Sequence, residues 1–470
     1  MNWKTIFKSL KNRDMLRRIL ALLGIIVACR FLAHIPVPLA EPTQLKEVIN
    51  SVISGSDFGG FLNLLSGGAL TSFSIILVGM SPFITSSIIT QLLTKAIPKL
   101  EELHKDGESG RRKINQWTRM IAVPLSIVQS IAFIYILRQT VLAGNTTLLA
   151  DSSIIVWVVA VAAMSAGSIL LMWLGELITE QGIGNGISLI IFAGIVSQLP
   201  QMIGNLGTSL FNTTNGSLNV FGWFTIPVDP MSAAIAVALL VAFIIVLYIL
   251  VKINEAQRII TINYAKRVHG NSSYGGIKSI LPVKLIAANV IPIIFAVAFL
   301  SLPAFVGQLL KATGNADYLG LANNLIAWFQ SPTPGSFTGE TMQAFIYPAA
   351  YFVLVIMFTY FYTGIVFNSN EISENLQKQG GFIEGVRPGI QTEKYLTRTM
   401  NRLTLFGSLA LGTIAIMPFI GEYLMYNIAG VTGSKLAIGG TGLLIVVSVA
   451  LEALRQINSR ALMVTYDDYK

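Results

Sequence analysis

The sequence predicts an all-α, multi-pass membrane protein with ten membrane-spanning helices, and two observations lead to this class. Of the 470 residues, 53 % are hydrophobic and only 12 % are charged, whereas soluble domains carry about 25 % charged residues. Apolar runs of 18 or more residues recur along the chain, and a helix of that length crosses the hydrocarbon core of a bilayer.

The ten expected spans divide into two sets of five near Asp229 and Pro230. This division gives an N-terminal half over residues 1–230, with spans one to five, and a C-terminal half over residues 231–470, with spans six to ten. Inverted repeats of this kind are common in transport proteins, although self-similarity here is too weak to establish one. In chain order, the expected spans cover residues 18–37, 74–94, 119–140, 152–174, 187–206, 231–252, 285–310, 343–367, 402–421 and 436–456.

Lys and Arg residues are distributed unevenly between the two sides of the membrane. The segments that the span order places on one side hold 27 of the 32. Since Lys and Arg favour the cytoplasmic side, we expect both termini in the cytoplasm. The first run, Ile19–Pro36, has no small-residue cleavage site, so we expect it to remain as a span. The net charge of +9 is then mainly a topology signal; docking of an acidic partner is a second interpretation. The basic segments are residues 1–18, 95–119, 252–284, 368–402 and 455–470.

The stretch over residues 57–94 holds two apolar pieces of unequal length. The first, Phe58–Leu65, is followed by Ser66, Gly67 and Gly68, which favour a turn. As a helix it would cover only about 12 Å, which is too short to cross the bilayer, whereas Phe73–Leu93 is long enough. A half-length segment must be buried in protein or line a cavity, because broken backbone in lipid is left unsatisfied. It is therefore either a re-entrant packing element or a stopper for a pore.

The spans contain almost no carboxylates or histidines, which ion-coupled transporters need at membrane depth. Arg30 is the clearest charge inside a span, and a structural role is expected for it. Polar uncharged residues do occur in the spans. They either form hydrogen bonds that hold helices together or make polar a helix interface that has to open. They include Thr85, Ser86, Ser87, Thr90 and Gln91 in span two, Gln129 in span three and Asn289 in span seven.

Enzymatic chemistry is not expected. The sequence offers no nucleophile–base pair, carboxylate pair or metal-ligand spacing, and Cys29 is its single cysteine. The string GIGNGIS over residues 182–188 lacks the lysine and the preceding strand of a phosphate-binding loop, so we interpret it as a tight turn before span five. No cofactor is expected.

Two cytoplasmic loops, over residues 253–284 and 368–401, are long and basic. In the first, Thr261–Lys266 and Ser279–Pro282 flank the turn-rich string NSSYGG, which predicts a projecting hairpin that carries Arg258, Lys266 and Arg267. The second has at its tip the string GVRPG, with Arg387 between turn residues. These loops either serve only as topology signals or present basic groups to a cytoplasmic partner. A tight loop is an inefficient way merely to place charge, so the second interpretation is favoured.

Several long strings together resemble one family, the SecY channel subunits of bacterial preprotein translocases. The resemblance runs from span one to the C-terminus without large insertions. It rests on FLNLLSGGAL (61–70), SPFITSSIITQLL (81–93), DGESGRRKINQWTR (106–119), LMWLGELITEQGIGNGISLIIFAGIV (171–196), EAQRIITINYAKRVHG (255–270), LPVKLIAANVIPIIFA (281–296), NLQKQGGFIEGVRPG (375–389) and GGTGLLIVV (439–447).

The resemblance implies an hourglass channel of two pseudo-symmetric five-helix halves around a central pore. A plug over residues 57–71 would close it, with Phe58, Phe61, Leu62, Leu64, Leu65, Ser66, Gly67 and Gly68. A pore ring of bulky aliphatic side chains would form the waist. Its members by motif are Met80, Ile84, Ile187, Ile191, Ile294 and Ile445. The family often has isoleucine where this chain has Met80, and methionine is flexible enough to keep the ring apolar.

The resemblance also implies a lateral gate between spans two and three on one side and seven and eight on the other, with Ser87, Gln129 and Asn289 as polar contacts. The function implied is conduction of unfolded secretory proteins across the bacterial cytoplasmic membrane and lateral insertion of membrane proteins. An accessory SecY paralogue for fewer substrates, a secondary transporter and a lipid or peptide flippase are the alternatives.

The partners implied are SecE, SecG, the SecA ATPase, the ribosome, signal-peptide-bearing preproteins and membrane lipid. Contact with SecA or the ribosome would fall on Arg387, and next on Arg258, Lys266 and Arg267. The chain has no nucleotide site of its own, so energy would come from a partner or from the membrane potential.

Overall fold

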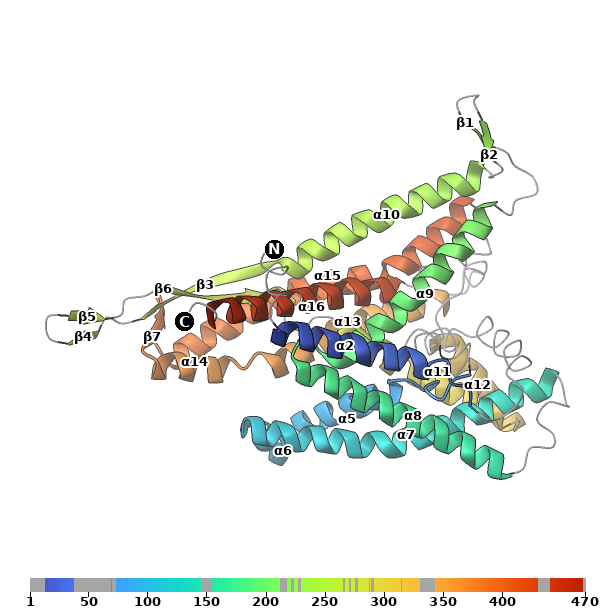
Figure 1. Ribbon diagram of the computed structural model, residues 1–470, viewed down its shortest axis with the longest axis horizontal. Helices are drawn as coiled ribbons and strands as arrows, with labels where there is room; N and C mark the ends of the chain where they lie inside the picture. The colour runs from blue at the N-terminus through green and yellow to red at the C-terminus, as the bar shows by residue number, and fades with distance from the viewer. Residues whose placement is uncertain are drawn as a thin grey trace. The chain divides into compact units, whose positions relative to one another are not determined.

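The computed structural model describes residues 13–37, 69, 73–144, 154–211, 218–220, 224–226, 230–264, 267–269, 272–274, 278–286, 288, 291–313, 315–329, 343–429 and 440–467. The chain forms two compact units, each of which is described by itself (Figure 1). Unit 1 comprises residues 1–229, 297–347 and 422–470, and unit 2 comprises residues 230–296 and 348–421. This clustering cuts across the predicted halves 1–230 and 231–470, which stay a prediction.

A long helix lies at each of the ten predicted spans, counted over the described residues. These helices are α2 (Arg13–Leu32), α5 (Ser81–Ala96), α7 (Glu108–Gly144), α8 (Ile154–Gln181), α9 (Gly186–Phe211), α10 (Pro230–Glu255), α11 (Ile291–Ala312), α13 (Gln343–Val366), α15 (Ile390–Ala429) and α16 (Gly440–Asp467). Within the same residues, five stretches are both long and apolar enough to cross a membrane. They are Ser109–Tyr135, Ile154–Gln181, Ile291–Lys311, Phe345–Lys378 and Ile390–Met417.

Shorter elements lie between these helices. The helices α6 (Pro98–Lys105) and α14 (Ser369–Lys378) lie in basic segments, and α12 (Ala316–Phe329) lies between α11 and α13, where no helix was predicted. The strands are β1 (Leu218–Val220), β2 (Phe224–Ile226), β3 (Gln257–Tyr264), β4 (Arg267–His269), β5 (Ser272–Tyr274), β6 (Lys278–Lys284) and β7 (Gly381–Ile383).

Two spans begin at least six residues later than the apolar runs predict. The helix α5 begins at Ser81 rather than at 74, because Phe73 (φ 44°) and Gly79 (φ 61°) have left-handed backbone and Pro82 lies in the first turn. The helix α11 begins at Ile291 rather than at 285, with Pro292 as its second residue. An apolar run therefore predicts which residues lie at membrane depth, but it does not predict the residue at which the helix begins.

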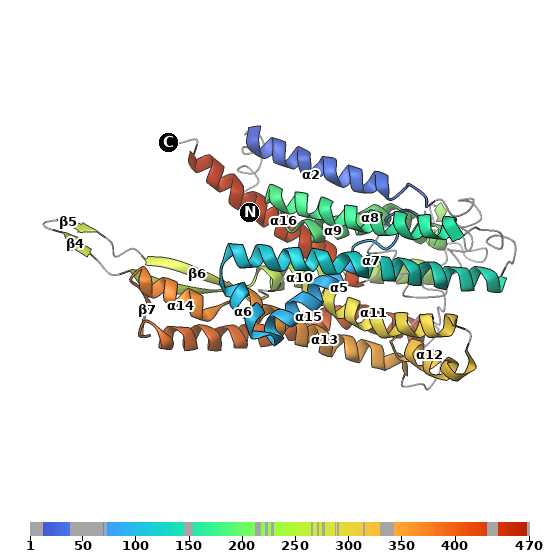
Figure 2. The ribbon, with the colours of Figure 1, turned by 90° about the horizontal axis from the view of Figure 1, so that it is seen from below.

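In unit 1, α7 packs against α5 and α8, α8 packs against α2 and α9, and α9 packs against α16 (Figures 1 and 2). Hydroxyl groups connect these helices. Ser86 Oγ of α5 donates to the carbonyl of Thr118 in α7, and Ser165 Oγ of α8 donates to Ser130 Oγ of α7 at 3.3 Å. The helix-contact interpretation is thus confirmed for Ser86.

Unit 2 contains a three-stranded antiparallel sheet in the order β6-β3-β7. The ladder between β3 and β6 confirms the predicted hairpin, and β4 and β5 lie beyond its far end (Figure 1). The strand β7 brings Ile383 opposite Ile262 of β3. A buried apolar cluster joins this sheet to the first half of α15, through Ile260, Val283, Ile383, Leu396 and Met400.

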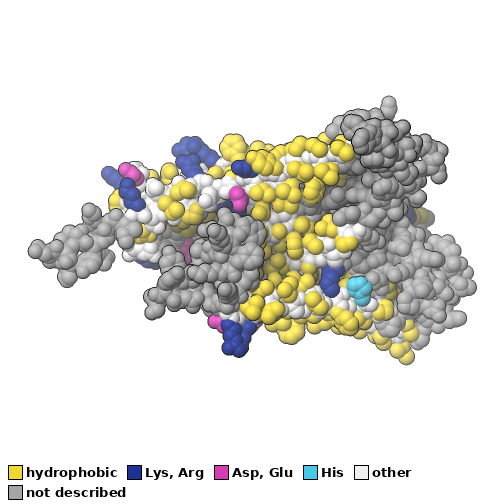
Figure 3. All heavy atoms as spheres, turned by 45° about the horizontal axis from the view of Figure 1, so that its top comes forward, with side chains coloured by type: hydrophobic (Ala, Val, Ile, Leu, Met, Phe, Trp, Pro, Cys, Tyr) yellow, Lys and Arg dark blue, Asp and Glu magenta, His cyan; other side chains and the backbone are white. Residues whose placement is uncertain are grey.

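Apolar side chains are exposed over much of the described surface drawn in Figure 3. On α2 and α8, Phe31 is 70 % exposed and Ile154 is 81 % exposed. Exposed apolar surface on this scale is stable in a lipid environment and not in water. The fold is therefore that of a multi-pass membrane protein.

Candidate functional site

Residues 73–80 form an irregular segment that leads into α5 and positions Met80. On the side of α2, the amide of Val37 donates to the carbonyl of Phe73 at 2.9 Å, and the amide of Ile75 donates to the carbonyl of Ile35 at 3.0 Å. Non-helical backbone at membrane depth is tolerated only where protein satisfies it, and these bonds supply partners from the end of span one.

The helix α8 holds the same segment from another side. Ser168 Oγ donates to the carbonyl of Gly79 at 2.8 Å. Gly167 packs so closely that a Cβ there would lie 2.2 Å from the carbonyl oxygen of Ile75. Met80 follows directly as the N-cap of α5 and is fully buried, and Ile84 lies one turn further and is also buried.

A tight connection between α8 and α9 fixes the second pair of predicted ring residues. Asn185 caps α9, since its Oδ1 accepts from the amide of Ile187 at 3.1 Å. Thr179 Oγ1 accepts from the amide of Gly186 at 2.9 Å. A Cβ on Gly186 would lie 1.8 Å from the carbonyl oxygen of Gly175. The GIGNGIS string is thus a turn between two helices in close contact, as predicted.

The predicted ring residues are aliphatic side chains at helix positions that the packing fixes. In unit 1, Ile191 is buried one turn after half-buried Ile187 on α9, and Ile445 is buried on α16, which packs against α9. Ile294 is buried near the start of α11 in unit 2. That these side chains surround one pore stays a prediction.

A small cavity of about 30 Å³ lies within unit 1. Its walls come from α5 and the segment before it, and from the helices α7 and α11. Gln129 lines it, as the lateral-gate prediction requires, and so do the side chains of Ser81, Thr85 and Ser301. A space of this size with several polar partners has room for about one water molecule. The other walls are Val78, Phe133, Ala298, Leu302 and Phe305.

Two other predicted gate residues are placed differently. Ser87 does not line this cavity; its Oγ accepts from Gln91 Nε2 one turn along α5, at 3.1 Å. Asn289 lies outside the described residues. The pairing of Gln129 with Asn289 therefore stays a prediction.

The predicted plug residues Phe58, Phe61, Leu62, Leu64, Leu65, Ser66, Gly67 and Gly68 lie outside the described residues. Within the stretch 57–71, only Ala69 is described. It is fully buried, and its carbonyl accepts from the amide of Ser74 at 3.0 Å. The end of the predicted plug is thus joined directly to the segment that carries Met80.

In unit 2, the string GVRPG forms a fixed loop that exposes Arg387. Gly385 (φ 78°) and Gly389 (φ 94°) have left-handed backbone, which glycine adopts without strain. Thr392 Oγ1 donates to the carbonyl of Arg387 at 2.9 Å, and Ser373 Oγ donates to the carbonyl of Gly389 at 2.8 Å. The guanidinium projects from a backbone that is bonded on both sides.

The structure describes only some of the predicted basic residues of the hairpin. Arg258 is exposed on β3, opposite Val283 of β6. Arg267 begins β4, of which only the backbone is described, and Lys266 lies outside the described residues.

Sequence reasoning missed three polar or small residues at the site. Gly167 and Ser168 fix the segment before α5, and Ser301 lines the cavity with Gln129. The string AAMSAGS over residues 162–168 is rich in the small residues that mark close helix packing in membranes, so the first two had a readable signal. Ser301 stands alone in an apolar run and gave none.

Comparisons with known proteins give one result. The SecY family model matches residues 74–454. The protein translocase subunit SecY of Mycobacterium tuberculosis is 37 % identical over 465 residues, and that of Corynebacterium glutamicum is 38 % identical over 466 residues; each comparison covers 98 % of both chains.

Solved structures agree. A protein-conducting channel superimposes with a TM-score of 0.60 at 19 % identity, over 93 % of this chain and 90 % of that one. Sec61 in the canine ribosome–channel complex from the endoplasmic reticulum gives a TM-score of 0.55 at 18 % identity, over the same shares. The all-α fold is that of these channels, and the chain belongs to the SecY family.

Proposed function

We propose that this protein is the polypeptide-conducting channel of a translocase in the bacterial cytoplasmic membrane. It would pass unfolded secretory proteins across the membrane and release apolar segments sideways into lipid. The observation that carries the proposal is the match to SecY translocase subunits over 98 % of the chain. The position of 27 of the 32 Lys and Arg residues in five segments supports cytoplasmic termini.

The physical properties of the predicted ring suit this task. A translocating chain presents every kind of side chain in turn, so a constriction that binds none of them must be apolar and deformable. Met80, Ile84, Ile191 and Ile445 are buried and aliphatic. An apolar constriction excludes ions by dewetting, and the flexible thioether of Met80 can follow changes in diameter.

The partners proposed are SecE, SecG, the SecA ATPase and the ribosome, with preproteins and lipid as the molecules handled. Exposed Arg387 and Arg258 in unit 2 support docking of a partner with anionic groups on the cytoplasmic side. We propose no enzymatic step in this chain, so the energy for movement comes from a partner or from the membrane potential.

The test is a crosslink to a chain in transit. A photoreactive residue replaces Ile84, and separately Ile187, while a secretory chain is stalled in membranes that carry this protein. We expect adducts at both sites. The control position is Val158, which is 61 % exposed on α8 and should contact lipid instead. A stalled, membrane-bound chain without adducts at Ile84 and Ile187 would mean that the ring is misassigned or that this protein is an accessory copy.

A second prediction concerns the seam that Gln129 lines. In Gln129→Leu an apolar side chain replaces a polar wall of this helix interface. The closed state of the interface should then be more stable by about 1 kcal/mol, which is the contribution of one neutral hydrogen bond. We expect that a nascent segment then needs about two more leucines to leave sideways, at about 0.5 kcal/mol each. The measurement is the inserted fraction of a series of test segments. The control is Gln198→Leu on α9, which does not line the cavity. If the hydrophobicity that a segment needs for insertion is unchanged in Gln129→Leu, then Gln129 is not part of the gate.

A further inference from the structure

The helix α12 has no part in the predicted ring, gate or partner contacts. It covers Ala316–Phe329, which is 14 residues. At about 1.5 Å per residue it is about 21 Å long, which is too short to cross a hydrocarbon core of about 30 Å. A helix of this length between the two long helices α11 and α13 either stands in water outside the bilayer or lies at its surface.

A short, hydrogen-bonded turn joins α12 to the end of α11. The hydroxyl of Thr313 donates to the carbonyl of Leu310 at 2.7 Å and closes the last turn of α11. Asn315 caps α12, since its Oδ1 accepts from the amide of Asp317 at 3.3 Å. Its carbonyl also accepts from the amide of Tyr318 at 3.2 Å. The start of α12 is therefore fixed to the end of α11.

The middle of α12 packs against α11 in unit 1 (Figures 1 and 2). A Cβ on Gly307 would lie 3.0 Å from each of three atoms, the carbonyl oxygen of Ala322, Cβ of Leu325 and Cγ1 of Ile326. Gly307 belongs to the stretch Ile291–Lys311, which is long and apolar enough to cross a membrane. The contact therefore holds α12 at the boundary of the membrane, because it lies inside the apolar part of α11.

The exposed surface of α12 has an apolar side and a polar side. Tyr318, Leu321 and Trp328 are 50 %, 53 % and 46 % exposed. Their spacing of three and seven residues places them along one face of the helix, which we name the aromatic face. Asn323 and Ala327 are exposed on the opposite side. Besides its contact with α11, the helix is thus amphipathic.

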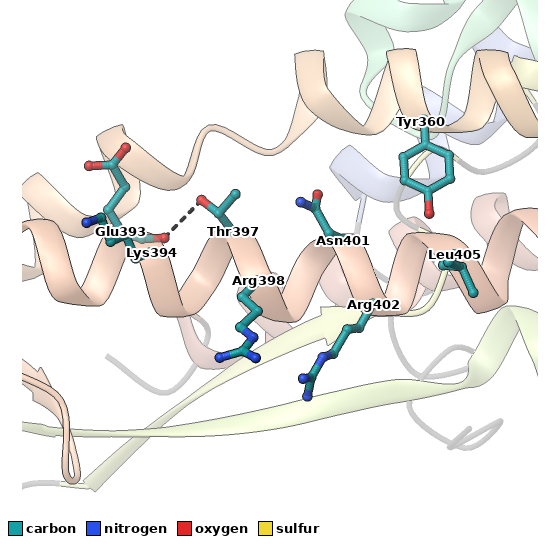
Figure 4. A pocket seen from close by; sticks show the side chains of 8 residues that line it. All are labelled: Tyr360, Glu393, Lys394, Thr397, Arg398, Asn401, Arg402 and Leu405. Atoms are coloured by element: carbon teal, nitrogen blue, oxygen red, sulfur yellow. Dashed lines mark hydrogen bonds between the residues drawn. The ribbon is translucent and has the colours of Figure 1, made fainter.

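The aromatic face also differs from charged exposed surface elsewhere in the protein. A hollow of about 740 Å³ along the first half of α15, in unit 2, has Glu393, Lys394, Arg398 and Arg402 among its walls (Figure 4). In α12 the only charged residue is Asp317, in the first turn. Tyrosine and tryptophan are enriched where a bilayer meets water, because their apolar rings and their polar groups are both satisfied there.

We propose that α12 is an interfacial helix whose partner is the surface of the bilayer. Tyr318, Leu321 and Trp328 lie among the lipids, and Asn323 faces water. The headgroup charge is unimportant, because α12 has no cation. A soluble protein that covered the aromatic face would have to enter the headgroup layer, since Gly307 holds the helix at that level.

This position has a consequence for the predicted lateral gate. The helix α11 is span seven, one of the predicted gate helices, and α12 would connect its end to the bilayer. The consequence for the gate rests on the proposed function, whereas the position of α12 does not.

The test compares how oxygen and a nickel chelate reach a nitroxide label on α12. Oxygen concentrates in lipid and the chelate in water, so the ratio of their collision rates with the label, measured by electron paramagnetic resonance, reports its surroundings. The full-length protein is placed in phosphatidylcholine nanodiscs. Labels are attached at one introduced cysteine at a time, in a Cys29→Ala background, because Cys29 is the single native cysteine.

We expect the oxygen-to-nickel ratio at Leu321→Cys and Trp328→Cys to be several times the ratio at Asn323→Cys and Ala327→Cys. Each polar-side position lies within two residues of an aromatic-face position, so the members of a pair differ in the side of the helix and hardly in distance along it. A melting curve of each variant establishes that the fold is kept. If Trp328→Cys does not fold, Tyr318→Cys on the same face takes its place.

Two positions outside α12 provide references. Val158→Cys, 61 % exposed on α8, gives the ratio for lipid, and Arg258→Cys, exposed on β3, gives the ratio for water. Three outcomes would overturn the proposal. The water ratio at all four positions would place α12 outside the bilayer, and the lipid ratio at all four would place it wholly in hydrocarbon. Labels on the aromatic face that neither reagent reaches would show that protein covers this face. The measurement involves no transport, so its failure leaves the proposed channel function untouched.

Discussion

Gly186→Ala is expected to prevent stable folding of unit 1. The added Cβ would lie 1.8 Å from the carbonyl oxygen of Gly175 and 2.9 Å from Cβ of Ile178. Both obstacles are fixed by helix α8, so no side-chain rotation relieves the overlap, and α8 and α9 must separate. We expect a loss of at least about 3 kcal/mol, at the upper end of overpacking effects. The measurement is the melting temperature and the yield of monodisperse protein in detergent.

The matched control for this prediction is Gly364→Ala in α13, where an added Cβ meets no atom within 4 Å. Removing a glycine from a helix interior should leave stability unchanged or raise it by about 0.5–1 kcal/mol. If the two variants melt at the same temperature, then the close contact between α8 and α9 is not required for the fold.

Under the proposed docking of SecA at the GVRPG loop, Arg387→Glu should reduce SecA-driven transport about 100-fold or more while the protein stays folded. The side chain is exposed, and the loop is held through main-chain carbonyls, by Thr392 and Ser373, so charge reversal leaves these bonds intact. Reversing one member of a close interfacial charge pair costs about 2–5 kcal/mol. The measurement is the rate of preprotein import into proteoliposomes that hold the reconstituted complex.

Lys378→Glu provides the comparison, because it makes the same charge change at an exposed position of the neighbouring helix α14. Among the described residues, Lys378 pairs with Glu374 one turn away, at 3.6 Å, and such surface pairs contribute little. Transport by this variant should stay within about threefold of the unmodified protein. Equal losses in both variants would indicate that the whole face, and not Arg387, receives the partner.

The sequence predicts the spans and the hairpin well for physical reasons. Length and apolarity are properties that a bilayer enforces on each segment separately, so ten apolar runs correspond to ten long helices among the described residues. The turn string between Tyr264 and Lys278 likewise determines locally that β3 and β6 pair. Neither inference needs knowledge of distant contacts.

Features that depend on distant contacts could not be read in this way. The irregular segment before α5 is held by bonds to Ile35 and Ser168. Gly79 and Pro82 are local signals for the late start of the helix, but nothing in the local string shows these distant partners. The cavity beside Gln129 needs Ser301 from a helix more than 150 residues away along the chain. The motif resemblance supplied the ring positions, which apolar periodicity alone left as ordinary helix faces.

The rigid GVRPG loop has a consequence for the thermodynamics of docking. Ordering a flexible backbone opposes association by about 1–2 kcal/mol per residue, and residues 385–389 are already ordered by left-handed glycines and two hydroxyl–carbonyl bonds. A partner therefore meets a preorganised loop backbone, and that backbone loses little conformational entropy on association. Loosening the loop with Thr392→Val should weaken docking through its entropy alone, with every charge still in place.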